Sequence, residues 1–90
     1  MLEREIPVIN PLGLHARAAA KLVRLAHTFE SRVSIRREDM GLEADAKNIL
    51  SVLHIAASRG VSLSITVDGS DEDEAMKAVE NLFARGFGEI

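Results

Sequence analysis

The segment at residues 61–68 limits which folds are open to this chain. Apolar and polar side chains alternate strictly along it, in the order VSLSITVD. Successive side chains of a β-strand point to opposite faces of the sheet, so the pattern predicts a strand with one buried and one polar face. A sheet of such strands needs helices on one face only.

Three more strands are predicted, at residues 2–9, 32–37 and about 42–44, with a tight turn between the last two. Apolar and polar residues also alternate in the second of these segments. Pro7 has no N–H to donate to a neighbouring strand, so the first strand should lie at an edge of the sheet or carry a bulge.

Two helices are predicted in the first two thirds of the chain, at about residues 16–29 and 47–58. The first should bury a stripe of four residues, Ala19, Leu22, Val23 and Ala26. Asp45 is a suitable N-cap for the second helix, and Gly60 is a suitable end. The second helix is apolar almost all round, so it is either fully buried or presents an apolar face to a partner.

A third helix should begin at Asp71, which is spaced from Glu74 as in a capping box, and end at Gly86 and Gly88. Its inner face should carry Ala75, Val79, Leu82 and Phe83. The resulting order, β-α-β-β-α-β-α, predicts one α+β domain over residues 1–90. The expected architecture is an open-faced β-sandwich, in which three helices cover one face of a four-stranded sheet.

The composition excludes several classes of protein. The chain has no cysteine, which excludes disulfides and thiolate metal sites and suits a reducing cytoplasm. The net charge of −3 argues against nucleic acid as a general partner. Long apolar runs, leaders, lipidation signals and nucleotide motifs are absent, so we expect a soluble, cytoplasmic protein without membrane insertion or cofactor.

The segment NPLGLHARAAAK, at residues 10–21, carries the candidate chemistry. Turn-forming residues lead into an alanine-rich run of high helix propensity, which places His15 at the start of a helix. Unpaired backbone N–H groups there, such as those of Ala16 and Ala18, favour an anion, and the Arg17 guanidinium suits phosphate. These features favour phosphoryl transfer to a neutral imidazole nitrogen of His15. A loop histidine that merely begins a helix is an equally good interpretation of these residues alone.

Other charged and histidine side chains receive a weaker interpretation. Arg17, Lys21 and Arg24 recur at helical spacing on one face. Such a face is usually only solvated, but this one begins at the candidate site. His27 should satisfy the last carbonyls of its helix. His54, on the second helix, should either pack there or lie at the edge of its apolar face. The histidine spacing does not support a metal site.

The order of elements and the motif GLHARAA, at residues 13–19, together resemble the HPr family of histidine phosphocarriers from the bacterial phosphotransferase system. A second segment, KNILSVL at residues 47–53, is similar to the second-helix motif of that family. The resemblance covers nearly the whole chain. It implies an antiparallel sheet with the first strand at an edge.

The resemblance also implies roles for particular residues. His15 would carry the phosphoryl group on Nδ1, and Arg17 would pair with it. The group would come from phosphorylated enzyme I and pass to a IIA domain, and the carrier is expected to be a monomer. Ile49, Leu50 and Leu53 would form the apolar docking patch. If the first two helices share one face of the sheet, Lys21 and Arg24 should lie next to this patch with His15 and Arg17, as a basic rim.

Three positions depart from the family pattern. Ala18 stands where many members have proline, which should not disturb a first helical turn. Leu12 replaces a polar residue that could contact the phosphoryl group. Asn48 stands where Gram-positive members have a regulatory serine, so phosphorylation by an HPr kinase is not expected there. Ser51 is nearby but does not match the motif.

Two alternatives remain open. One is a carrier in a regulatory, nitrogen-type branch of the phosphotransferase system, with the same chemistry and a different output. The other is a ferredoxin-like RNA-binding or small-molecule-sensing domain of similar element order. RNA binders of that kind stack bases on sheet aromatics. This chain has no tyrosine or tryptophan, and its three phenylalanines lie on predicted helices or beyond them.

Overall fold

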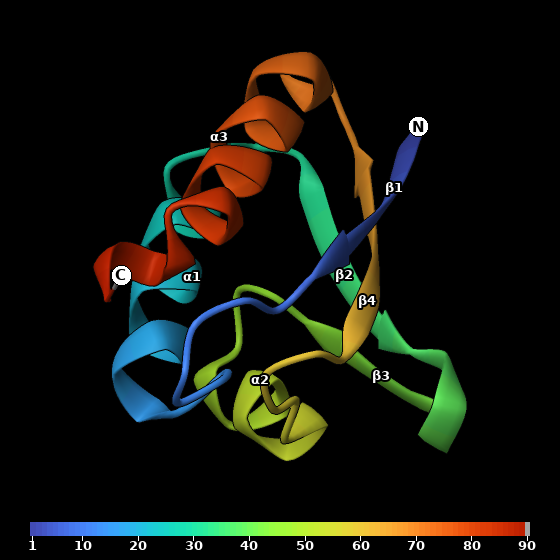
Figure 1. The fold of residues 1–90 in the computed structure, drawn as a ribbon. Helices are drawn as coiled ribbons and strands as arrows, with labels where there is room; N and C mark the ends of the chain where they lie inside the picture. The colour runs from blue at the N-terminus through green and yellow to red at the C-terminus, as the bar shows by residue number, and fades with distance from the viewer. Residues whose placement is uncertain (90) are drawn as a thin grey trace.

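The computed structural model describes residues 1–89, and the chain alternates strands and helices in the predicted order (Figure 1). The strands are β1 (Leu2–Pro7), β2 (Arg32–Arg37), β3 (Leu42–Asp45) and β4 (Ser62–Asp68). The helices are α1 (Ala16–His27), α2 (Ile49–Ile55) and α3 (Glu72–Ala84), with short 3₁₀ turns η1 (Glu38–Met40) and η2 (Gly86–Gly88).

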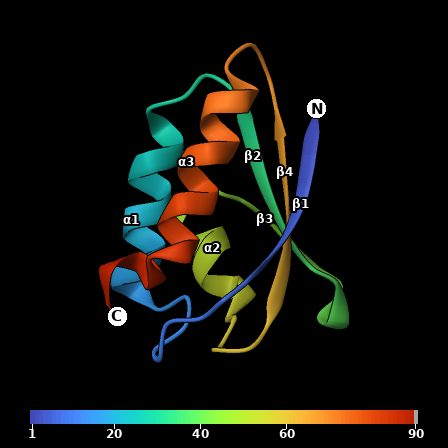
Figure 2. The same cartoon turned by 45° about the horizontal axis from the view of Figure 1, so that its top comes forward.

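The four strands form one antiparallel sheet in the order β1-β4-β2-β3. The first strand lies at an edge, as the proline predicted, and Pro7 is its last residue, opposite Ser62. In Figures 1 and 2 the helices α1, α2 and α3 lie on one side of the sheet, and the other side is uncovered. The predicted open-faced α+β sandwich is therefore confirmed.

The core lies between the sheet and the helices. Alternate residues of β4, namely Leu63, Ile65 and Val67, are fully buried, and their polar neighbours face outward. From the helices, Leu22 and Phe83 are buried against this face. The strict alternation of residues 61–68 thus has the predicted cause, a sheet with one covered face.

The second helix differs most from its prediction. It spans seven residues, and its N-cap is Asn48, whose Oδ1 accepts from the Ser51 N–H over 3.1 Å. Asp45, the predicted cap, is the last residue of β3, and its carboxylate accepts from the Lys47 N–H instead. The helix ends at Ala56, which adopts a left-handed conformation (φ 51°), rather than at Gly60. The predicted helix was too long because apolar residues continue in the sequence beyond the last residue of the helix.

The third helix has Asp71 as its N-cap residue, as predicted, but the predicted capping box is wrong. The Asp71 carboxylate accepts from the backbone N–H groups of Glu30 and Ser31, each over 2.9 Å, and from the Ser31 hydroxyl. Glu72 accepts from the Gly69 N–H over 3.1 Å. Asp71 therefore links the start of α3 to the loop before β2, because a non-local pair of donors outcompetes the local cap.

Smaller differences concern the ends of elements. The strand β1 stops at Pro7, although Val8 still exchanges hydrogen bonds with Val61 and Gly60. The helix α1 stops at His27 rather than near residue 29. In its buried stripe, Val23 is only half-buried and Ala18 is fully buried.

Candidate functional site

The loop before α1 is fixed against the end of α2. Gly13 adopts a positive φ of 67°, and its N–H donates to the Asn10 carbonyl over 3.1 Å. A Cβ at Gly13 would lie 2.5 Å from the Ala57 carbonyl oxygen, so only glycine fits. The next N–H, that of Leu14, donates to the same oxygen over 2.8 Å. These contacts with Ala57 fix the position of the next residue, His15, at which the helix begins.

His15 is the N-cap of α1, as predicted. Its carbonyl accepts the first helical hydrogen bond, from the Ala19 N–H over 2.8 Å. The N–H groups of Ala16, Arg17 and Ala18 precede that bond and have no acceptor within the helix. They give this end of α1 a partial positive charge that favours an anion.

A shallow hollow of about 580 Å³ opens at this helix start. Its lining includes the predicted pair of His15 and Arg17, together with Pro11, Leu12, Ala16 and Glu89. Arg17 is exposed, and Leu12 is 70% exposed. The structure therefore brings the predicted nucleophile and the predicted guanidinium to one place, and the apolar side chain of Leu12 lies beside them.

The imidazole of His15 is partly exposed and touches a carboxylate. Its Nε2 lies against Oε2 of Glu89, and the two side chains are 28% and 15% exposed. Within residues 1–89, this is the one side-chain hydrogen bond that the ring makes. Nδ1 is therefore the ring nitrogen that remains available to a reacting group.

Glu89 is a site residue that the sequence did not predict. Its Oε1 accepts from Nδ2 of Asn10 over 2.8 Å, and Asn10 itself is fully buried. The hydrogen bond from Asn10, and next that from His15, hold the pKa of the Glu89 carboxyl below its ordinary value. It therefore stays ionised over the physiological range. Glu89 is 74 residues from His15 in the chain, so no local spacing could have revealed the contact.

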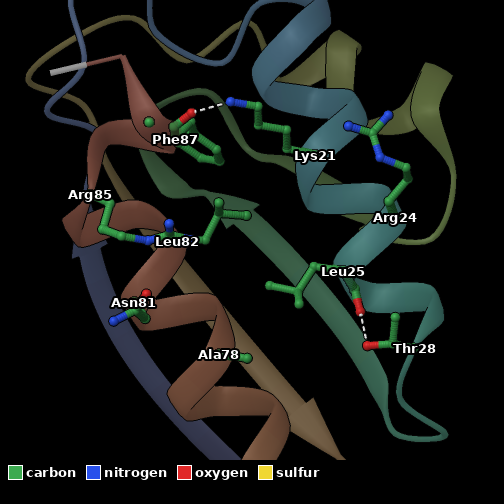
Figure 3. Close-up of a pocket in the computed structure, with 10 residues that line it drawn as sticks. Lys21, Arg24, Leu25, Thr28, Ala78, Asn81, Leu82, Arg85 and Phe87 are labelled. Carbon is green, nitrogen blue, oxygen red and sulfur yellow. Dashed lines mark hydrogen bonds between the residues drawn. The ribbon is translucent and has the colours of Figure 1, made fainter.

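The other predicted cations, Lys21 and Arg24, line a second hollow. This groove, of about 600 Å³, lies between α1 and α3 and includes Leu25, Leu82 and Phe87 (Figure 3). Nζ of Lys21 donates to the Phe87 carbonyl over 2.6 Å, shown as a dashed line in Figure 3. The side chain of Lys21 is thus directed toward the C-terminal segment.

The predicted docking patch on α2 is partly exposed. Leu50 is 75% exposed and Ile49 is 37% exposed, whereas Leu53 is half-buried and packs against the core. The helix buries Val52 and Ile55 instead. Figures 1 and 2 place α2 and the start of α1 at the same end of the helical layer. The patch therefore lies on the same side of the sheet as the candidate site.

The remaining histidines lie outside this arrangement. Nε2 of His27 contacts the Lys47 carbonyl over 2.9 Å, rather than the carbonyls of its own helix as predicted. His54 is exposed on α2, which fits the predicted place at the edge of the patch rather than a packed one. Residues 1–89 contain no group of three or more metal-binding side chains placed to hold an ion. No helix in the same range is long and apolar enough to cross a membrane.

An open-faced α+β sandwich with a partly exposed histidine at a helix N-terminus is the arrangement of one class of protein, the small histidine phosphocarriers. Comparison with known proteins agrees. The family model described as the PTS HPr component phosphorylation site matches residues 2–85. The chain therefore belongs to the HPr family, and it is a phosphocarrier of the phosphotransferase system.

Individual relatives span nearly the whole chain. It is 48% identical to phosphocarrier protein HPr of Cupriavidus necator over 99% of this chain and 98% of that protein. It is 40% identical to phosphocarrier protein NPr of Proteus mirabilis over 96% and 94% of the two chains. The crystal structure of HPr-C-His from Thermoanaerobacter tengcongensis superposes with a TM-score of 0.93 at 34% identity, covering 100% and 99% of the two chains.

Proposed function

We propose that His15 is the residue that carries the phosphoryl group, and that the group is attached at Nδ1. The observation that supports this most directly is the arrangement of the ring. Nε2 is engaged by Glu89, while Nδ1 is left at a helix start whose N–H groups favour an anion. Family membership supplies the chemistry, and the geometry supports this residue and this atom.

The proposed transfer runs from one protein nitrogen to another. The Nδ1 lone pair of neutral His15 forms a bond to phosphorus as the N–P bond of the donor breaks, and that electron pair returns to the donor nitrogen. The Arg17 guanidinium and the first N–H groups of α1, including those of Ala16 and Ala18, offset the negative charge that arrives. The reverse sequence of bond changes passes the group to the acceptor. The phosphoryl transfer itself requires no cofactor.

The proposed donor is phosphorylated enzyme I, and the proposed acceptors are IIA domains. Docking would use the exposed apolar residues Leu50 and Ile49, with Leu53 beneath them, and the cations Lys21 and Arg24. An apolar centre with basic neighbours suits an acidic partner surface, because apolar contacts supply affinity and charges supply steering. We propose further that residues 1–90 act as one domain, as a monomer, in the cytoplasm.

The nitrogen-type regulatory branch is a second candidate role. The 40% identity to NPr of Proteus mirabilis supports it, whereas the 48% identity to HPr of Cupriavidus necator favours the general carrier. The chemistry at His15 is the same in both. Incubating the phosphorylated protein with sugar-type and nitrogen-type IIA domains in parallel, and measuring which is labelled first, distinguishes them.

Phosphoryl acceptance is tested by incubation with phosphoenolpyruvate and enzyme I, followed by mass spectrometry of the intact chain. We expect one acid-labile phosphoryl group on the wild-type protein and none on His15→Ala. The variant should remain folded, because His15 lies outside the core. Labelling of His15→Ala at the wild-type rate would contradict the proposal. His54→Ala, which changes an exposed histidine on α2, is the matched control and should be labelled normally.

A further inference from the structure

Asn10, Glu89 and His15 form a continuous chain of contacts from the core to the reactive ring. Nδ2 of Asn10 donates to Oε1 of Glu89 over 2.8 Å, and Oε2 of Glu89 lies against Nε2 of His15. Asn10 is fully buried, whereas the His15 side chain is 28% exposed. The buried Asn10 thus contacts the Glu89 carboxylate, and that carboxylate contacts the His15 ring.

The orientation of the Asn10 amide is fixed by its surroundings. Nδ2 faces two oxygen acceptors, the Gly13 carbonyl at 2.7 Å and Glu89 Oε1 at 2.8 Å. The flipped amide would place its oxygen against both of them, so the NH₂ group must lie on this side. Oδ1 is then buried with no partner among the described residues. The side chain is held by the two hydrogen bonds that it donates, one of them to Glu89.

The segment after α3, which carries Glu89, is held in place by packing and by a hydrogen bond. Phe87 is 1% exposed, and the centroid of its ring lies 4.8 Å from the centroid of the Phe83 ring. Its positive φ of 56° bends the chain after α3, and Lys21 donates to its carbonyl over 2.6 Å (Figure 3). These contacts come from α1 and α3, so the position of Glu89 is set by the body of the protein.

We infer that Glu89 is a positioning residue that holds His15 in its Nε2–H tautomer, and that Asn10 acts through Glu89 by fixing its carboxylate. An ionised carboxylate only accepts hydrogen bonds, so Nε2 must carry the proton. A neutral imidazole has one ring proton, so Nδ1 then carries the lone pair. This inference rests on the proposed function, since it explains why Nδ1 is the reacting atom.

The same contact acts during transfer. When the Nδ1 lone pair forms the bond to phosphorus, the ring gains positive charge that is shared with Nε2–H. The Glu89 carboxylate lies beside that N–H and offsets the charge, and no proton leaves the ring. When the N–P bond breaks toward the acceptor, the electron pair returns to Nδ1 and the Nε2–H tautomer is restored. Glu89 thus stabilises the reacting ring without itself changing protonation.

Glu89→Gln tests the inference because glutamine has one accepting oxygen, whereas Asn10 Nδ2 and His15 Nε2 each need one. Asn10 Nδ2 would keep the amide oxygen, and the new NH₂ group would face Nε2 of His15, which selects the unreactive Nδ1–H tautomer. Ring ¹⁵N shifts of the unphosphorylated proteins should show mainly Nε2–H in the wild type and substantial Nδ1–H in the variant. The maximal rate of phosphoryl acceptance should fall about tenfold, with little change in the KM for phosphorylated enzyme I.

Glu74→Gln, on the exposed face of α3, removes the same charge and is the control. It should change neither the tautomer nor the rate. A wild-type ring that is mainly Nδ1–H, or a Glu89→Gln variant with unchanged tautomer and rate, would overturn the inference. Because the ¹⁵N measurement needs no phosphoryl donor, it gives an answer even if the proposed carrier residue is wrong.

The role of Asn10 is tested by a double-variant cycle. Asn10→Asp keeps the shape of the side chain but replaces the donating NH₂ with an oxygen, which repels Glu89. Asn10→Asp should slow phosphoryl acceptance. The double variant Asn10→Asp with Glu89→Gln should accept the phosphoryl group no more slowly than the slower of the two single variants, because both substitutions act on the contact between Glu89 and His15. Multiplicative effects, or an Asn10→Asp ring with the wild-type tautomer, would overturn the assignment of Asn10. Asn81→Asp, on the surface of α3, is its control.

Discussion

At the scale of single residues, Arg17 is the cation that we propose meets the phosphoryl group. It shares the hollow at the start of α1 with His15 and is exposed. Arg17→Ala should slow phosphoryl acceptance by about tenfold to a hundredfold, since a hydrogen bond to a charged group contributes about 1.5–3 kcal/mol. Stopped-flow transfer from phosphorylated enzyme I measures this. Arg36→Ala, on the exposed side of β2, removes an equal charge and should have no such effect. An unchanged rate in Arg17→Ala would show that the guanidinium does not meet the group.

Asn48 gives a second prediction at this scale. Its side chain caps α2 by accepting from the Ser51 N–H, and an amide offers no hydroxyl for phosphorylation. Incubation with ATP and an HPr kinase should therefore leave the protein unmodified, as measured by mass spectrometry. Phosphate on Ser51, absent from a Ser51→Ala control, would contradict this prediction.

The residues of the candidate site differ in whether neighbouring positions in the sequence could predict them. His15 and Arg17 could be predicted because a turn, a helix start and a cation are adjacent in the chain. Glu89 and Asn10 could not, since their contact joins residues 79 positions apart and depends on the bend at Phe87. Sequence patterns report neighbours along a helix or strand, and this contact is between elements.

At the scale of elements, α2 presents an exposed side chain to test. Leu50 is 75% exposed, so Leu50→Glu should change the free energy of unfolding by less than about 1 kcal/mol. If Leu50 is a central docking anchor, association with enzyme I should weaken by ~1–3 kcal/mol. Thermal denaturation and partner titration on one variant measure both quantities.

Met40→Glu is the matched control for Leu50→Glu. Met40 is 60% exposed and lies on η1, outside α2, so the same change of apolar to acidic should leave partner binding unaffected. A stable Leu50→Glu variant with unchanged binding would show that partners dock elsewhere. A strongly destabilised variant would contradict the exposure of this side chain.

The prediction of the elements succeeded where periodicity was strong and failed where caps compete. Strand β2 has the predicted bounds, and β4 begins one residue later than predicted. Asp45 is not the N-cap of α2, and its carboxylate accepts from Lys47. Asp71 is the N-cap residue of α3 as predicted, but its carboxylate accepts from Glu30 and Ser31 rather than from its own helix. A short acidic side chain accepts from any N–H within reach, and tertiary packing decides which N–H that is.

At the scale of the whole molecule, Asp71 links two distant parts of the chain in a pH-dependent way. Hydrogen bonds from the Ser31 hydroxyl and the Glu30 N–H hold the pKa of Asp71 below its ordinary value. A carboxyl group with a lower pKa in the folded state contributes stability above its unfolded pKa, about 3.9. That contribution is lost as the pH falls through the folded pKa.

Asp71→Asn should therefore lower the free energy of unfolding at neutral pH, and the difference from the wild type should shrink as the pH falls below about 4. Urea denaturation at a series of pH values measures this. Asp73→Asn, an exposed acid in the first turn of α3, is the control. A wild-type advantage that grows toward low pH would reverse the sign and contradict the assignment.

The central proposal is that His15 carries the phosphoryl group on Nδ1 while Glu89 engages Nε2. The most direct test is NMR of the uniformly ¹⁵N-labelled protein after phosphorylation by enzyme I and phosphoenolpyruvate. We predict a ³¹P–¹⁵N coupling to Nδ1 of His15, with the proton retained on Nε2. A coupling to Nε2, or to a nitrogen of His27 or His54, would contradict the proposal.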